Sequence, residues 1–88
     1  MLDYVKTALR VKTSVFDVEL QGLIDACKAD LRMVGIRIPE GDDALIQRAV
    51  TLYCKAHFGF NEDGERYMKA YDMLKMSLAL AGDYRVGR

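Results

Sequence analysis

Few residues of this chain are of the types that carry out chemistry. Its 88 residues include two cysteines and one histidine. Cys54 and His57 lie three positions apart, so in a helix they would share a face, and Cys27 is available as a third ligand. A zinc site needs four such ligands, or three with an open position, but both cysteines stand in strongly apolar segments, where a free thiol behaves as a small hydrophobic side chain. We therefore expect structural cysteines and no metal site.

The sequence also gives no support for acid–base or nucleophilic catalysis. A catalytic thiolate requires an electropositive, partly exposed setting, which the apolar surroundings of both cysteines do not offer. The paired carboxylates Asp42-Asp43 and Glu62-Asp63 stand at expected helix starts, where capping explains them. The glycines do not have the spacing of a phosphate-binding loop or a dinucleotide fingerprint. We expect neither an enzyme nor a cofactor.

The charges are balanced along the whole chain. There are 13 Lys and Arg against 13 Asp and Glu, and residues 1–35, 36–59 and 60–88 carry 5, 3 and 5 of each sign. Phosphate binding needs a cluster of cations, so nucleic acid is a poor direct partner. No apolar run approaches the length of a membrane span, and the N-terminal residues lack the apolar block of a signal peptide. We expect a soluble protein with no membrane partner, in a reducing compartment.

Turn signals divide the chain into four helical blocks. These signals lie at Gly35, at residues 39–42, at residues 59–64 and at Gly82. The predicted helices run approximately over residues 2–10, 18–34, 43–58 and 62–81, and residues 36–39 are predicted to be a loop because no partner strand is evident. The predicted fold is all-α: one domain over residues 1–88, a small four-helix bundle with short loops and an irregular C-terminal tail at 83–88.

The helix ends carry residues that commonly cap helices. The predicted N-caps are Asp17 or the upstream Ser14, then Asp42, then Asn61 or Asp63. Gly35 is predicted to follow the C-terminus of the second helix. Gly22 lies inside that helix at a cost of about 1 kcal/mol relative to alanine, and we interpret it as a site of close packing.

The third helix is apolar around most of its circumference and is predicted to be central, with only Gln47, Arg48, Thr51 and Lys55 left for solvent. The fourth helix carries two apolar stripes. The stripe predicted to face the core contains Tyr67, Tyr71, Leu74, Leu78 and Ala81. Met73, Met76 and Leu80 lie on the opposite side, which indicates contact with another chain. The alternative is that these three are scattered exposed residues of the kind found on every protein surface.

The chain also resembles a known family over nearly its whole length. The residues that carry the resemblance are Asp17-Val18-Glu19-Leu20, Leu23 to Lys28, Asp30-Leu31, Gly35-Ile36, Ala49-Val50, Leu52 to Ala56, Phe58-Gly59, Tyr67, Tyr71-Asp72, Leu74-Lys75 and Leu78. In order and spacing they resemble the small α-helical head-tail connector, or adaptor, proteins of tailed bacteriophages and prophages.

The resemblance implies a structural role and no catalysis. A connector of this kind forms a homo-oligomeric ring that docks on the capsid portal, joins it to the tail or to the next head-completion protein, and extends the DNA channel. DNA would pass through the ring without specific binding. The location implied is the head-tail interface of the virion, with the host cytoplasm as the place of assembly.

The candidate contact residues come from the fourth helix and the tail. A ring requires heterologous contacts, in which one patch meets a different patch on the neighbour. The candidates for subunit or portal contacts are Met73, Met76, Leu80, Tyr84, Arg85 and Arg88. The tail residues are chosen for terminal position and residue type. The alternative is a small helical regulatory or DNA-binding module that uses Arg48, Thr51 and Lys55, although two cations are few for that task.

Overall fold

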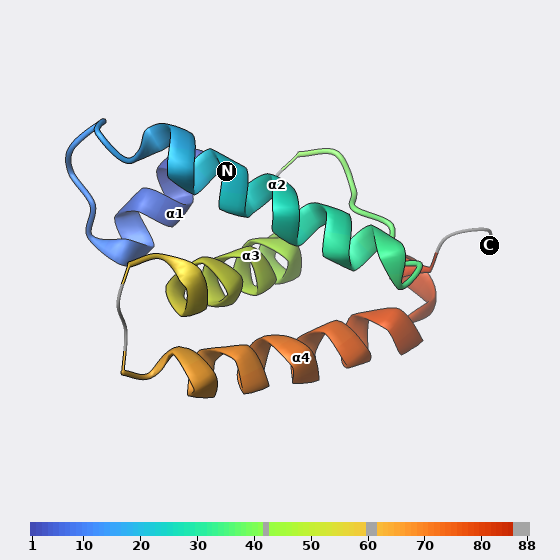
Figure 1. Cartoon of the computed structure of the whole chain (residues 1–88). Helices are drawn as coiled ribbons and strands as arrows, with labels where there is room; N and C mark the ends of the chain where they lie inside the picture. The colour runs from blue at the N-terminus through green and yellow to red at the C-terminus, as the bar shows by residue number, and fades with distance from the viewer. Residues whose placement is uncertain (42, 60–61, 86–88) are drawn as a thin grey trace.

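Four α-helices make up most of the molecule (Figure 1). The computed structural model describes residues 1–41, 43–59 and 62–85. Helix α1 spans Leu2–Leu9, α2 spans Asp17–Met33, α3 spans Ala44–His57 and α4 spans Gly64–Leu80, and a 3₁₀ helix, η1, spans Gly82–Tyr84. The predicted all-α class is confirmed. None of the described helices is long and apolar enough to cross a membrane.

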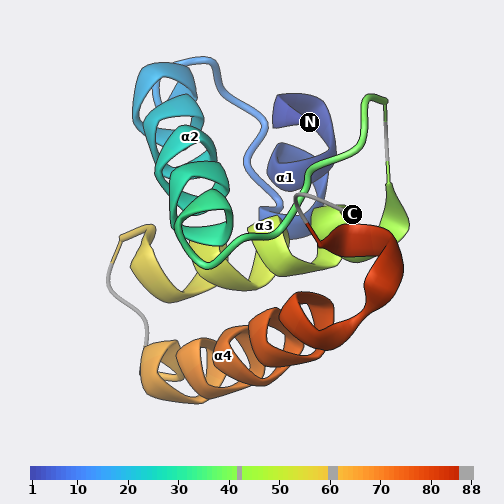
Figure 2. The ribbon, with the colours of Figure 1, turned by 90° about the vertical axis from the view of Figure 1, so that its right-hand side faces the viewer.

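Helix α3 lies between α2 and α4, and α1 packs beside both α2 and α3 (Figures 1 and 2). In both views α2 is above α3 and α4 is below it. Helices α2 and α4 also run in the same general direction, with their C-terminal ends at the right of Figure 1. The outer faces of α2 and α4 therefore point to opposite sides of the molecule.

The central position predicted for α3 is confirmed. Its buried side chains are those of Ile46, Ala49, Val50, Thr51, Leu52 and Cys54. The prediction that Thr51 faces solvent is wrong, since it is only 7% exposed. Three helices pack on α3 and Thr51 is buried in this packing, whereas Leu45, which the pattern did not assign to solvent, is 45% exposed. Burial of Thr51 also removes the exposed face that a recognition helix with Arg48 and Lys55 would need.

The start of α3 lies one residue later than predicted. The N-cap is Asp43, whose Oδ1 accepts hydrogen bonds from the backbone N–H groups of Leu45 and Ile46 at 3.0 and 3.1 Å. The predicted cap, Asp42, lies outside the described residues. Two adjacent aspartates are equivalent by residue type, and the geometry of the turn selects the second.

The start of α2 also differs from the prediction. Phe16 occupies the N-cap position without a side-chain hydrogen bond, so neither Asp17 nor Ser14 caps the helix through its side chain. Asp17 is the first residue of α2, and its carboxylate lies 2.7 Å from the Lys6 Nζ on α1. The acid therefore joins two helices, and it retains the favourable position of a negative charge at a helix N-terminus. At α4 the N-cap position is that of Asp63, one of the two predicted, whereas Asn61 lies outside the described residues.

The end of α2 is as predicted and continues into an unexpected pairing. Gly35 has φ of +84°, a left-handed conformation in which a side chain would be strained. The Gly35 N–H donates to the carbonyl of Arg32, and the Ile36 N–H donates to that of Leu31, which makes a Schellman motif. The turn sends Ile36 into the core, where it pairs in an isolated bridge with Arg85. The segment 36–39, predicted to lack a partner, thus finds one near the C-terminus.

Gly22 does not mark close packing within the chain. A methyl group built at this position would meet no described atom within 4 Å apart from its own helix and neighbours. The prediction of close packing is wrong for the isolated chain, because Gly22 lies on the exposed outer face of α2. The helix therefore carries the conformational cost of a glycine with no compensating contact in the fold.

This geometry predicts that Gly22→Ala stabilises the folded chain. Alanine lowers the entropy lost on helix formation and meets no obstacle, so the free energy of unfolding should rise by about 1 kcal/mol. Urea denaturation followed by circular dichroism measures it. The reverse change at an exposed position of the same helix, Ala29→Gly, is the matched control and should lower stability by a similar amount. A Gly22→Ala variant no more stable than the parent would contradict this description of the site.

Candidate assembly surface

The outer face of α4 is an apolar strip. Met73, Met76 and Leu80 are 71%, 64% and 81% exposed. Their spacing of three and four residues places them along one side of the helix, opposite the buried Tyr71 and Leu78. The predicted division of α4 into a core face and an exposed apolar face is confirmed, except that Ala81 is the exposed C-cap rather than a core residue.

A partly buried polar network around Tyr71 fixes the rotation of α4. The Tyr71 hydroxyl donates to Oδ2 of Asp30 on α2 at 2.6 Å, and Lys75 Nζ reaches the same oxygen at 3.0 Å. The Cys27 thiol on α2 lies 3.7 Å from the Tyr71 hydroxyl. Because Tyr71 is fully buried, its hydroxyl requires a partner, and Asp30 supplies one. Turning α4 to hide its methionines would break this set of bonds.

The protonation states of the network follow from burial and hydrogen bonding. The hydrogen bond from Tyr71 lowers the pKa of the Asp30 carboxyl most, and Lys75 lowers it further against the effect of burial. Burial, then the bond to Asp30, raises the pKa of the Tyr71 hydroxyl. A charged Asp30 therefore accepts from a neutral Tyr71, which is the stronger class of hydrogen bond.

Among the described residues, those considered and set aside for metal or thiol chemistry form no metal-binding cluster. Burial raises the pKa of the Cys27 thiol to about 11 and that of Cys54 to about 12, so both stay protonated at neutral pH. His57 is exposed at the end of α3, with its ring centroid 4.4 Å from that of Tyr53. Within residues 1–41, 43–59 and 62–85, no three side chains of the types that hold a metal form a cluster.

The C-terminal segment is held against the body as far as residue 85. The Tyr84 hydroxyl donates to the Asp43 carboxylate, with O–O distances of 2.8 and 3.0 Å. Arg37 donates its backbone N–H to the Tyr84 carbonyl and a guanidinium N–H to the Asp83 carbonyl. Residues 83–85 are thus not a free tail, and the Tyr84 hydroxyl has a partner within the chain. Arg85 is exposed, and Arg88 lies outside the described residues.

The pKa values of Asp43 and Tyr84 shift in the same directions as those of Asp30 and Tyr71. Burial raises the pKa of the Asp43 carboxyl, but hydrogen bonds from Ile46, Tyr84 and Leu45 together lower it below its usual value. The hydrogen bond to Asp43 raises the pKa of Tyr84. One carboxylate therefore caps α3 and holds Tyr84 of η1.

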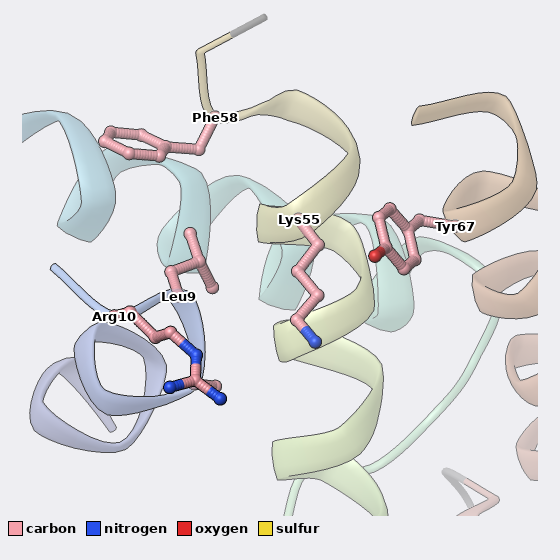
Figure 3. A pocket seen from close by; sticks show the side chains of 6 residues that line it. Leu9, Arg10, Lys55, Phe58 and Tyr67 are labelled. Carbon is pink, nitrogen blue, oxygen red and sulfur yellow. The ribbon is translucent and has the colours of Figure 1, made fainter. Parts of the chain in front are cut away.

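A small pocket opens where α1, α3 and α4 meet (Figure 3). Leu9 and Phe58 line one side and Tyr67 the other, with the Lys55 chain between them and Arg10 alongside. Its volume of about 230 Å³ is below the roughly 300–1,000 Å³ of small-molecule sites. This pocket is therefore smaller than a typical small-molecule site.

A second hollow adjoins this pocket, and it groups basic side chains although the charges along the sequence are balanced. It is lined by Lys6, Arg10 and Lys12, so the fold gathers basic side chains around the end of α1. Lys6 is engaged by Asp17, and Lys55 lies 5.6 Å from the Tyr67 ring centroid. The group is not the row of available cations that phosphate binding requires.

The chain matches a known protein family. A family model described as "Phage connector protein" matches residues 1–85. The chain belongs to the phage connector protein family. Neither the curated proteins nor the solved structures that were compared match it. The resemblance to head-tail connectors is thereby confirmed, and the connector is placed among the structural proteins of the bacteriophage virion.

The connector has a second exposed apolar face, on α2, which the sequence pattern did not reveal. Val18 and Met33 are 88% and 84% exposed. Between them on the same face lie Gly22, Ala26 and Ala29, all exposed. The face was missed because three of its five members are small and carry little hydrophobic signal. Their spacing opposite the core stripe of α2 was the available clue.

The Tyr71 network predicts how the connector responds to Tyr71→Phe. Loss of a hydrogen bond to a charged partner should lower the free energy of unfolding by about 1.5–3 kcal/mol at pH 7, measured by urea denaturation. The folded-state pKa of Asp30 is lowered, so its contribution is present above the usual carboxyl pKa of about 3.9 and is lost as pH falls through the folded value. The stability difference between variant and parent should therefore shrink in acid.

The control for this variant is Tyr67→Phe. The Tyr67 hydroxyl makes no hydrogen bond in the described part of the chain, so its loss should change stability little. A difference for Tyr71→Phe that stays constant from pH 7 to below the carboxyl range would mean that Asp30 does not depend on Tyr71.

Proposed function

We propose that the connector is a non-enzymatic, single-domain subunit that assembles with copies of itself into a ring on the capsid portal. At this head-tail interface the ring joins the tail or the next head-completion protein and extends the DNA channel. The subunit uses no cofactor. The observation that carries the proposal is the apolar strip Met73–Met76–Leu80, exposed on a helix whose rotation the core fixes.

The strip supplies the free energy that assembly requires. Burial of a methionine or leucine side chain contributes about 1.5–3 kcal/mol, and three such side chains lie in one row. The strip is held in place by Tyr71 and Leu78 on the opposite side of α4. Little ordering of this helix is therefore needed on contact, so less of the gain is lost to entropy.

The charge balance supports passage of DNA without binding. The chain has a net charge of zero, and the basic group around Arg10 is partly neutralised by Asp17. A ring of neutral subunits offers few free cations to neutralise DNA phosphates and release the counterions condensed on the DNA, so DNA is not retained. In this proposal Arg85 and Arg88 contact the portal, and the bond from Tyr84 to Asp43 positions the adjacent Arg85.

The proposal predicts that Met76→Asp abolishes self-assembly and binding to portal rings. A carboxylate in the strip would have to be desolvated on contact, which opposes association. Light scattering of concentrated protein and co-sedimentation with portal rings measure the loss. Circular dichroism should be unchanged, because Met76 is 64% exposed.

The matched control is Val15→Asp, the same change at an exposed apolar residue outside the strip. It should assemble like the parent. A Met76→Asp variant that also assembles normally, or one that unfolds while Val15→Asp stays folded, would contradict the assignment of the strip to assembly.

A further inference from the structure

The two exposed apolar faces of the connector have different shapes. The α4 strip presents three long side chains, whereas the middle of the α2 face is formed by the small residues Gly22, Ala26 and Ala29. Small residues let a second helix approach closely, and long ones fill the space that they leave. The helices that carry these faces lie on opposite sides of α3 (Figures 1 and 2), and each face is opposite the buried residues of its own helix. This is the arrangement that a head-to-tail contact between identical copies requires.

Ring closure restricts how the two helices can meet. In a ring of many copies, each copy is rotated by only a small angle from its neighbour. Helices α2 and α4 run in the same general direction within one copy (Figure 1). Helix α4 of one copy must therefore meet α2 of the next in a parallel orientation. An antiparallel contact would turn each copy by about half a turn and give a dimer or a fibre.

One parallel register matches the apolar residues of both faces. Ala26, Ala29 and Met33 are spaced by three and then four residues, and so are Met73, Met76 and Leu80. A shift of 47 positions aligns all three pairs. Spacing of three and four is that of a parallel coiled-coil seam, in which corresponding residues lie at the same level. Ala26 then receives Met73, Ala29 receives Met76, and Met33 meets Leu80.

The same register brings opposite charges together. It places Arg66 opposite Glu19, and Lys69 opposite Gly22, where the missing side chain leaves room for it. From there Lys69 can reach the Glu19 and Asp25 carboxylates, which flank Gly22 on the outer face of α2. The same shift also places Asp72 opposite Asp25, a like-charge pair. Asp72 lies 3.8 Å from Lys75 of its own helix and Asp25 accepts a hydrogen bond from Gln21, so both charges are partly offset.

We infer that α4 of one connector subunit packs in parallel on α2 of the next, with Met73, Met76 and Leu80 against Ala26, Ala29 and Met33. The inference rests on the ring proposed above and names the surfaces that form it. It also explains why a glycine stands at position 22, which the isolated fold does not explain. Any larger residue there would compete with Lys69 of the neighbouring subunit for space.

The size of the contact indicates how the ring forms. A helix of 17 residues is about 25 Å long and about 10 Å wide, so one such contact covers far less than the roughly 800 Å² per partner of a stable pair. Two subunits alone should associate weakly. Closure stabilises the ring because each copy then makes two contacts at once.

Disulfide trapping between two differently tagged variants tests the register. Met33→Cys and Leu80→Cys are mixed at high concentration under mild oxidation, and the mixed dimer is measured on a gel. It should form at least about ten-fold faster than a dimer of either variant alone, because closure holds the two thiols at high effective concentration. The native Cys27 and Cys54 are fully buried and stay protonated, so they do not compete.

The matched control is Val18→Cys mixed with Leu80→Cys. Residue 18 lies about 22 Å along α2 from residue 33, so this pair should give only background. Efficient Val18–Leu80 trapping would show antiparallel packing, and Leu80→Cys dimers would show an α4–α4 contact. Either result, or no excess in the Met33–Leu80 mixture, overturns the inference.

Ring formation is tested separately, by electron microscopy of the parent protein. Rings without the Met33–Leu80 product would overturn the register alone. Absence of rings together with absence of portal binding would overturn the proposed function.

Discussion

The hydrogen bond from Tyr71 to Asp30 is the interaction on which the rest of the structure depends. A buried phenol cannot be left without a partner, and the nearest satisfied arrangement joins α4 to α2 at 2.6 Å. That bond sets which side of α4 faces inward. Once Tyr71 points into the core, Met73 and Met76 must point away from it. The exposed strip therefore follows from the apolar periodicity of α4 together with this hydrogen bond, which fixes the rotation of the helix.

The helices and the two faces of α4 could be predicted from the chain because both depend on periodicity within a segment. What could not be predicted joins distant segments. The Tyr71–Asp30 bond spans 41 positions, and the pairing of Ile36 with Arg85 depends on where the whole fold brings the chain end. The N-cap of α3 could not be predicted for a different reason. Asp42 and Asp43 are the same residue type, and only the geometry of the turn decides which one caps the helix. The α2 face was missed because its small residues give almost no signal until the fold shows that they are exposed.

The two outer faces give the connector a polarity that suits a chain of identical contacts. One face carries long flexible side chains and the other mainly small ones, so in the proposed assembly each copy offers both halves of one interface. The proposed interface is no wider than a helix and is therefore narrow. We expect such a subunit to remain separate when dilute and to assemble where many copies are held together, as on a capsid.

The most direct measurement is electron microscopy of the concentrated connector, alone and with portal rings. We expect closed rings of uniform diameter, with neighbouring subunits related by a small rotation and α4 of each lying beside α2 of the next. Two-fold dimers, open filaments, or particles that remain monomeric at all concentrations and on the portal would contradict the assembly described here.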